Sequence, residues 1–266
     1  MDRKFTTVFM LALAVMAVAI AGCTGADETV PVVEKVTIID VKYIVGIDGE
    51  YPPYSYIDKD GNPTGFDVES IKWIADKKGF DVEIQPMAWD GIIPALQAGK
   101  IDMVYSGMTI TDERLEKVNF SKPYWVANQA VAVRADSEIT LDDYKAGKVV
   151  CGAQRGSTAA EWIETNLIKT ELMPEDNLKL YDNFPLAVSD LENKRIDAAM
   201  YDTPVVKDII AEKDDVVMLG TIQTDEEYGI AVRKDDVRLL NALNDGLDML
   251  MADPYWKELI EKYKLA

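Results

Sequence analysis

The sequence predicts an α/β protein of two similar lobes, each with a mostly parallel sheet flanked by helices. Short buried-strand patterns alternate with amphipathic helical patterns, and this alternation is typical of parallel sheets covered by helices. A basic turn, an Ile-Asp strand and a polar residue at the strand's exit also occur together twice, at 99–106 and at 194–202. The repeat indicates two lobes, although repeats this short also arise by chance.

The elements follow in order after residue 40. Helix 66–78 has apolar residues at helical spacing and is ended by Gly79, and helix 237–251 has one apolar face. A short helix is expected to start at Thr111. The other predicted strands are 42–47, 82–87, 100–105, 130–134, 148–153, 178–181, 196–200 and 228–233. The other predicted helices are 89–98, 159–168, 184–193 and one that starts at Asp253-Pro254.

Composition excludes several classes of function. The 266 residues suffice for one large domain or two small ones. The formal net charge of -19 argues against nucleic acid and against an anionic membrane surface as partners. The chain contains no His, so His-based triads, general bases and metal ligands are excluded.

The N-terminus has the pattern of an export signal. Arg3 and Lys4 precede an apolar run over 8–21, and small residues stand directly before Cys23, an arrangement that resembles a lipobox. We therefore expect a lipoprotein signal peptide at 1–22, a lipidated Cys23, and a flexible tether at 23–40. The protein would lie outside the cytoplasm, in the periplasm or on the cell surface. A plain signal peptide with an incidental Cys, or an uncleaved anchor helix, are the alternatives.

One turn imitates a calcium loop. Asp58, Asp60, Asn62 and Glu69 fall at positions one, three, five and twelve of such a loop. Position six requires a Gly, but Pro63 stands there with a fixed φ. We expect a hairpin turn that leads to a helix, and no metal.

Polar and aromatic side chains gather at the predicted strand exits and helix starts, where ligands bind in parallel sheets. They are Asp48, Tyr51, Trp89, Ser106, Gly107, Thr109, Arg114, Ser157, Thr158 and Asp202. One cation, one opposed carboxylate and several hydroxyls suit a zwitterion. Arg114 would take an α-carboxylate, helped by Thr109 and by backbone N–H groups near Thr158, and Asp202 would take an α-ammonium.

The remaining members of this set would face the ligand's side chain. Asp48 with Tyr51 and Trp89 favours a cationic group, through charge and cation–π attraction. Each residue also has a purely structural interpretation. Tyr51 and Trp89 could be core or rim aromatics, Asp48 could cap a turn, and Arg114, flanked by acidic residues, could lie on a solvated helix face.

Five segments carry a resemblance to a known family: GIDGEYPPYSY, GFDVE, WDGIIPALQAGKIDMVYSGMTITDERLEKVNFSKPY, GSTA and RIDAAMYD. They resemble the family 3 extracellular solute-binding proteins that serve amino-acid ABC importers, over essentially all of the chain after the tether. The resemblance implies a type II periplasmic-binding-protein-like fold of two lobes, 41–126 plus 224–266 and 127–223. Two crossover hinges near 127–130 and 220–227 would join the lobes, which close on the ligand.

The resemblance also implies roles. Arg114 matches the Arg that clamps the carboxylate, with Thr109 and Thr158 as its neighbours, and Asp202 matches the ammonium-binding Asp. Tyr51 and Trp89 match the aromatic pair around the side chain. Gly107 departs from the family, since a second Ser is common there, and Gln154 and Ala159 occupy variable pocket positions that leave specificity open.

The implied function is capture of a free amino acid, basic or polar, by a monomer that docks on an ABC permease, without cofactor or catalysis. Two alternatives keep the fold. One is a dehydratase-type enzyme, with Glu50 or Asp48 as its acid or base. The other is a sensory module that reports its ligand to a receptor.

Overall fold

The computed structural model describes residues 41–265, which form two five-stranded sheets and one small three-stranded sheet. The predicted signal peptide at 1–22, Cys23 and the tether lie outside the described residues. The first sheet has the order β5 (Asp81–Pro86), β1 (Lys42–Ile47), β6 (Met103–Val104), β13 (Ala231–Val232), β7 (Asn119–Phe120). The second has the order β10 (Leu178–Tyr181), β9 (Cys151–Gln154), β11 (Ala198–Asp202), β8 (Trp125–Arg134), β12 (Val216–Tyr228).

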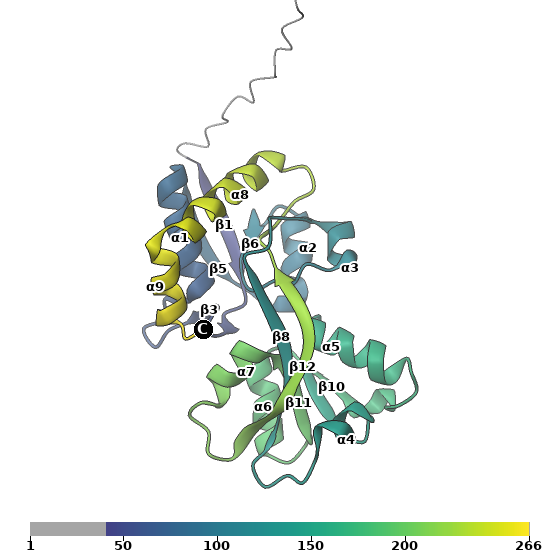
Figure 1. The fold of residues 1–266 in the computed structure, drawn as a ribbon. Helices are drawn as coiled ribbons and strands as arrows, with labels where there is room; N and C mark the ends of the chain where they lie inside the picture. Colours follow the sequence, from purple (N-terminus) through teal and green to yellow (C-terminus); the bar gives the residue numbers. More distant parts are fainter. Residues whose placement is uncertain (1–40, 266) are drawn as a thin grey trace, which may run out of the picture. The chain divides into compact units, whose positions relative to one another are not determined.

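The two sheets share one topology. In the first, β13 alone runs antiparallel to its neighbours, and in the second, β8 alone does so. Each sheet with its helices is one lobe of a two-lobed type II fold, as predicted (Figure 1). The carboxyl ends of β1, β6, β9 and β11 deliver the loops that build the site.

The sequence repeat corresponds to a repeated contact. Asp102 Oδ2 accepts a hydrogen bond from the backbone N–H of Ile44 at 2.8 Å, and Asp197 Oδ2 accepts one from Val150 N–H at 2.9 Å. In each lobe the Asp that precedes β6 or β11 therefore hydrogen-bonds to the backbone at the start of the neighbouring strand, β1 or β9. Ile101 and Ile196, which precede these residues, are buried in the core.

Helices of the first lobe are α1 (Phe66–Lys78), α2 (Ile92–Gln97), α3 (Asp112–Lys117), α8 (Val237–Ala252) and α9 (Pro254–Lys262). Helix α1 has the predicted bounds and ends at Gly79, which adopts the left-handed conformation with φ 76°. It packs closely on α8 (Figure 1), because a Cβ at Gly246 would lie 2.5 Å from the Ile74 side chain.

Helices of the second lobe are α4 (Leu141–Lys145), α5 (Thr158–Ile163), α6 (Phe184–Glu192) and α7 (Thr203–Ile210). A π-helical turn, Glu164–Ile168, continues α5, and a 3₁₀ turn, Glu175–Asn177, precedes β10. Cys151 is fully buried in this lobe, as expected of a small core residue. None of the helices between residues 41 and 265 has the length and apolarity that a membrane span requires.

The predicted hairpin turn is confirmed. Strand β3 (Ser55–Ile57) pairs antiparallel with β4 (Pro63–Thr64), and β2 (Glu50–Tyr51) completes this small sheet. Asp58 Oδ1 accepts from the N–H groups of Asp60 at 2.9 Å and Asn62 at 2.8 Å. These bonds close the turn as an Asx motif.

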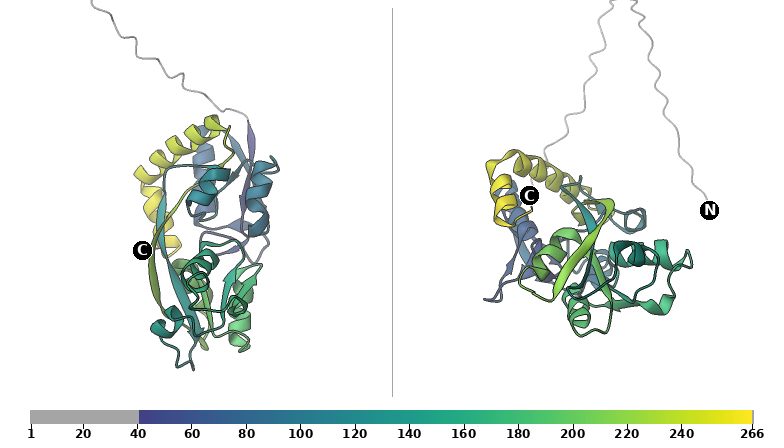
Figure 2. Two further views of the ribbon diagram at one scale, coloured as in Figure 1. Left: turned by 90° about the vertical axis from the view of Figure 1, so that its right-hand side faces the viewer. Right: turned by 60° about the horizontal axis from the view of Figure 1, so that its bottom comes forward.

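Strands β8 and β12 run side by side as a long antiparallel pair, visible in Figure 1 and in the left view of Figure 2. The ladder is interrupted between Ile222 and Glu226 by a bulge, where Asp225 has φ 49°. Asn128 Oδ1 accepts from the N–H groups of Thr224 and Asp225, both at 2.9 Å. One amide side chain therefore fixes the bulge that leads into Glu226.

The sequence prediction was wrong in several places. Strand β12 and helices α4 and α7 were not predicted. Predicted strands 100–105 and 228–233 are shorter, 103–104 and 231–232, and predicted helix 89–98 begins with a 3₁₀ turn, Trp89–Gly91. Strand β6 is short because Asp102 is used as a side-chain tie to Ile44, so the chain before Met103 bends.

Candidate functional site

Nine of the ten predicted site residues line one inner cavity between the lobes. The lining residues are Tyr51, Trp89, Ser106, Gly107, Thr109, Arg114, Ser157, Thr158, Tyr201 and Asp202. The first six come from the first lobe and the last four from the second. The cavity measures about 10 Å³, so side chains of both lobes nearly fill it.

Arg114 lies inside the protein and not on a solvated helix face. Thr111 caps α3 by accepting from Arg114 N–H at 3.2 Å, and this turns the side chain inward, where it is 8% exposed. Its Nη1 donates to Thr109 O at 2.9 Å and its Nη2 to Gly156 O at 3.1 Å. The guanidinium also lies 5.5 Å from the Trp89 ring centre. Burial lowers the pKa of Arg114, and the negative charge of Glu226 opposes this shift.

Asp202 is the last residue of β11 and points its carboxylate at the other lobe. Its Oδ2 accepts from the Tyr51 hydroxyl at 2.6 Å, and its Oδ1 accepts from Gln129 Nε2 at 2.5 Å. The pKa of Asp202 is raised to about 7, first by burial and then by the negative charge of Glu226; the hydrogen bonds from Tyr51 and Gln129 act in the opposite direction.

Asp48 is buried but does not line the inner cavity. Its Oδ2 accepts from Gln154 Nε2 at 2.8 Å, and the Tyr201 hydroxyl, which does reach the cavity, donates to Gln154 Oε1. Its Oδ1 accepts from Glu50 N–H at 2.9 Å, so it also caps the turn after β1. Burial raises the pKa of Asp48. Gln154, expected at a variable pocket position, therefore connects Asp48 to Tyr201 in the wall of the inner cavity.

Ser106 and Ser157 use their hydroxyls to shape the loops. Ser106 Oγ accepts from Asp48 N–H at 3.0 Å and lies 2.7 Å from Ser55 Oγ, which fixes the exits of β6 and β1 together. Ser157 caps α5, since its Oγ accepts from Ala160 N–H at 3.2 Å and donates to Gln154 O at 2.7 Å.

The structure gives a reason for Gly107 in place of Ser. Its φ is +54°, a left-handed conformation that favours Gly. A Cβ at this position would lie 2.5 Å from the Tyr51 ring. The Gly107 N–H donates to Asp67 Oδ2 at 2.7 Å. The absent side chain thus lets Tyr51 lie over the loop and reach Asp202.

Tyr201 of the cavity lining was not predicted, and neither were two polar residues that hydrogen-bond to the lining, Gln129 and Glu226. Gln129 of β8 is 1% exposed and contacts Asp202, and Glu226 of β12 accepts from Thr109 Oγ1 at 2.8 Å and from Thr158 Oγ1 at 2.6 Å. The sequence around Gln129 has the pattern of a buried core strand. The acidic run around Glu226 has the pattern of a solvated surface. The strand pairing of β8 with β12 was the signal that could have placed them together.

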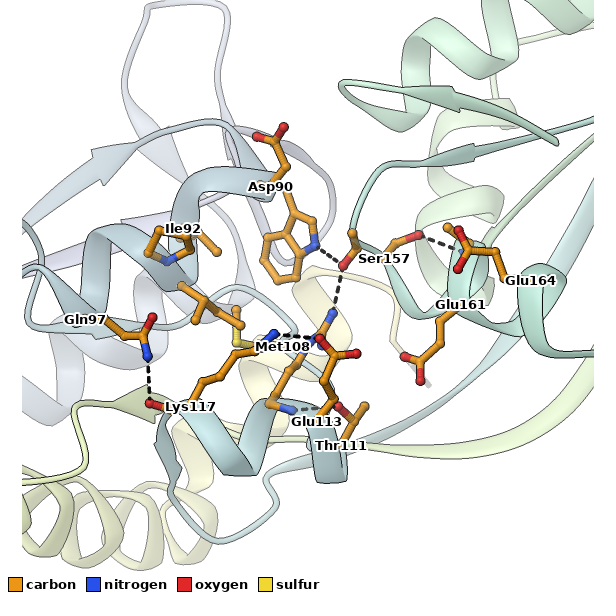
Figure 3. A pocket seen from close by; sticks show the side chains of 16 residues that line it. Asp90, Ile92, Gln97, Met108, Thr111, Glu113, Lys117, Ser157, Glu161 and Glu164 are labelled. Atoms are coloured by element: carbon orange, nitrogen blue, oxygen red, sulfur yellow. Dashed lines mark hydrogen bonds and ion pairs between the residues drawn. The ribbon is translucent and has the colours of Figure 1, made fainter. Parts of the chain in front are cut away.

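A larger outer pocket of about 400 Å³ adjoins the inner cavity and shares Trp89, Arg114 and Ser157 with it. Figure 3 shows Glu113 and Lys117 of α3 facing Glu161 and Glu164 across this pocket. Lys117 Nζ lies 2.6 Å from Glu113 Oε1. The Trp89 and Arg114 side chains thus separate the inner cavity from an outer pocket whose lining includes more acidic than basic residues.

A two-lobed α/β fold with opposed charged groups from both lobes at one cavity is typical of a protein that binds a small molecule between its lobes. The family model for bacterial extracellular solute-binding proteins, family 3, matches residues 43–266. The chain belongs to this family.

Known relatives are named as binding proteins. The L-cystine-binding protein TcyJ of Escherichia coli (strain K12) is 33% identical over 224 residues, which is 83% of this chain and 81% of that protein. The arginine-binding extracellular protein ArtP of Bacillus subtilis (strain 168) is 36% identical over 233 residues, 84% and 86% of the two chains. A solved structure of an ancestral arginine-binding protein bound to arginine is similar with a TM-score of 0.78 and 36% identity, covering 85% of this chain and 99% of that one.

Proposed function

We propose that this protein captures a free amino acid between its lobes outside the cytoplasm and delivers it to an ABC importer. One observation carries the proposal: Arg114 of the first lobe and Asp202 of the second line the same inner cavity. A guanidinium and a carboxylate on opposite walls are complementary to the two charges of an α-amino acid. The names of the relatives support the same class of ligand.

The charges favour a cationic amino acid. Three carboxylates accompany Arg114: those of Asp202 and Glu226 share hydrogen bonds from Gln129, and that of Asp48 is joined through Gln154 to Tyr201 in the cavity wall. A ligand with an additional positive charge reduces this imbalance, whereas an acidic ligand increases it. The aromatic rings of Tyr51 and Trp89 provide faces for a cationic side chain.

Binding and closure are coupled in this proposal. Hydrogen bonds that cross between the lobes include those that join Tyr51 to Asp202, Gln154 to Asp48, Thr158 to Glu226, and both Trp89 and Arg114 to Gly156. A cavity of about 10 Å³ admits no amino acid unless these contacts open. A ligand that contacts both walls therefore stabilises closure.

The lobe boundaries follow from the strand pair. We infer that β8 and β12 contain the two hinges, so the first lobe comprises 41–126 plus 224–266 and the second 127–223. The antiparallel pairing and the bulge before Glu226 support this division, since bending concentrates where a ladder is interrupted. Lipidation of Cys23 would tether the monomer to the membrane near its permease.

The proposal includes no catalytic step. Asp48 accepts from Gln154 Nε2 and from Glu50 N–H, and its hydrogen bonds are those of a structural carboxylate. The enzyme alternative needs a positioned acid or base at the reacting atoms. Slow turnover of a bound compound by the purified protein would favour it.

Differential scanning fluorimetry of residues 24–266 against the common amino acids and L-cystine tests the proposal. We expect the transition temperature to rise with at least one amino acid, most with a basic one. If none of them stabilises the protein, the proposed function is wrong.

Arg114→Ala tests whether Arg114 belongs to the ligand-binding site. The substitution removes the guanidinium that would clamp the carboxylate, so calorimetry should detect no binding of the amino acid that stabilises the wild-type protein. Lys117→Ala, on the exposed face of the same helix, is the matched control and should bind normally. Wild-type affinity in the Arg114 variant would remove this residue from the site.

A further inference from the structure

Glu226 contacts both lobes with one carboxylate. Its Oε2 accepts from the Thr109 hydroxyl of the first lobe at 2.8 Å and from the Thr158 hydroxyl of the second at 2.6 Å. Its Oε1 accepts from Gln129 Nε2 at 2.9 Å. The residue is half-buried, next to the bulge of β12, so its position is set by the strand that carries the hinge.

These contacts determine whether the two threonine hydroxyls can act as donors or as acceptors toward a ligand. A hydroxyl has one proton to donate and two lone pairs with which to accept. Both threonine protons are directed to Glu226, and charge-assisted bonds of this length are stronger than neutral ones. Thr109 and Thr158 therefore present only acceptors to anything else that binds in the inner cavity.

The other groups around Glu226 show the same shortage of donors. Gln129 Nε2 donates to Glu226 and to Asp202 Oδ1 and, at a longer 3.4 Å, lies near one lone pair of Thr158 Oγ1; the Tyr51 hydroxyl donates to Asp202 Oδ2. Within residues 41–265 the buried Oε1 of Gln129 has no hydrogen-bond partner. This end of the cavity thus combines the carboxylate of Asp202 with acceptor oxygens whose neighbouring donors are already used, and the carboxylate of Glu226 is bonded to two of the lining residues without lining the cavity itself.

We propose that Glu226 is a specificity-determining residue that makes this end of the site select an ammonium group, by holding the hydroxyls of Thr109 and Thr158 as acceptors. An ammonium brings three N–H donors and a positive charge, which match this set of acceptors. The inference deepens the proposed function and rests on it. It also changes the role expected of the two hydroxyls, which would then serve the ligand's ammonium, while Arg114 serves the carboxylate.

A role of Glu226 in competition with the ligand would have the opposite effect on binding. If Glu226 instead competed with the ligand's carboxylate for the threonine hydroxyls, removing its charge would strengthen binding. Selection of an ammonium requires the reverse, because Glu226→Gln places an N–H₂ group where one carboxylate oxygen stood. An N–H₂ group cannot accept the threonine hydroxyl protons. The hydroxyls would therefore turn and direct protons, in place of lone pairs, toward the ammonium.

The test compares ligands that differ only in the α-ammonium. L-arginine is paired with 5-guanidinopentanoate, and L-histidine with imidazolepropionate, and calorimetry gives the affinity ratio of each pair. We expect Glu226→Gln to lower this ratio about tenfold or more by weakening the amino acid alone. Glu227→Gln, an exposed neighbour with the same change of charge, should leave it unchanged.

A double-mutant cycle shows whether Glu226 acts through the hydroxyls. In a Thr109→Val background the effect of Glu226→Gln should shrink, because the hydroxyl that it orients is gone. Equal losses for both members of a ligand pair, additive effects in the cycle, or tighter binding by Glu226→Gln would each overturn the inference. If the wild-type protein binds no amino acid at all, the proposed function fails and this inference fails with it.

Discussion

The indole Nε1 of Trp89 donates a hydrogen bond to the carbonyl oxygen of Gly156 at 3.1 Å, from the first lobe to the second. Arg114 Nη2 donates to the same oxygen, also at 3.1 Å. Gly156 has φ +73° and stands in the loop between β9 and α5, so one backbone carbonyl receives donors from both residues that separate the inner cavity from the outer pocket. This carbonyl therefore joins the two lobes at the boundary of the inner cavity.

Trp89→Phe should shift the protein toward an open form. The substitution keeps an aromatic ring over Arg114 but removes the N–H that reaches Gly156. One hydrogen bond of this kind contributes roughly 0.5–1.5 kcal/mol, so binding of the stabilising amino acid should weaken about three- to tenfold. Small-angle scattering should show a larger radius of gyration without ligand. Trp73→Phe on α1, far from the site, is the control, and identical behaviour of the two variants would contradict a role for this contact.

Asp48→Asn should separate cationic from neutral ligands. Asp48 reaches the cavity wall through Gln154 and Tyr201, and its charge attracts a positive side chain. L-arginine and L-citrulline have nearly the same shape, but only arginine is cationic. We expect calorimetry to show arginine weakened about tenfold and citrulline nearly unchanged. Equal losses for both ligands would mean that Asp48 serves only to shape the turn after β1.

Much of the fold and of the site could be predicted from local pattern. Helix α1 was predicted with its bounds because apolar spacing defines its buried face and Gly79 ends it in a conformation that Gly adopts at little cost. The inner cavity gathers the predicted residues because the carboxyl ends of parallel strands meet at one edge of a sheet. Both results depend on rules that act over a few residues or one sheet.

The parts that were missed depend on pairing across the chain. Strand β12 pairs with β8, about 90 residues earlier, and its polar run Gln223 to Glu227 contains a bulge that breaks the alternation of buried and exposed residues. Glu226 therefore reads as surface although it reaches Thr109 and Thr158. Helix α7 did leave a local signal, Pro204 two residues after the strand exit at Asp202, which is typical of a helix's first turn.

Asp67 should make the fold less stable as the pH rises. Its pKa is raised to about 8 because the carboxyl is fully buried, although Tyr124 and Gly107 donate to its Oδ2 at 2.9 and 2.7 Å. Between about pH 4 and pH 8 the folded protein holds a proton that the unfolded chain has lost, so the free energy of unfolding should fall as the pH rises through this window. Urea denaturation at about pH 5 and pH 8.5 measures this slope.

The slope should be smaller in Asp67→Asn, because the amide cannot ionise. Asp60→Asn, on the exposed hairpin turn, should keep the wild-type slope. A slope in Asp67→Asn equal to that of the wild-type protein would show that Asp67 is not the group responsible.

The pH dependence of ligand binding should reflect the ionisation of the Asp202 carboxyl group. Its pKa is raised to about 7, by burial and by Glu226, in a setting that also includes Tyr51, Gln129 and Tyr228. An ammonium pairs with the ionised carboxylate, so below about pH 7 the ligand binds only after a proton leaves. For L-arginine, whose own charges stay constant over this range, affinity should therefore fall by up to about tenfold for each pH unit between about 7 and 5.

Calorimetry in two buffers with different heats of ionisation should detect release of about one proton on binding near pH 6, and less near pH 8. Asp202→Asn cannot ionise, so whatever weak binding it retains should lose this dependence. Proton release that persists in this variant would assign the titration to Asp48, whose pKa burial also raises. An affinity independent of pH in the wild-type protein would mean that Asp202 stays ionised, and its pairing with Gln129 and Tyr51 would then outweigh the repulsion from Glu226.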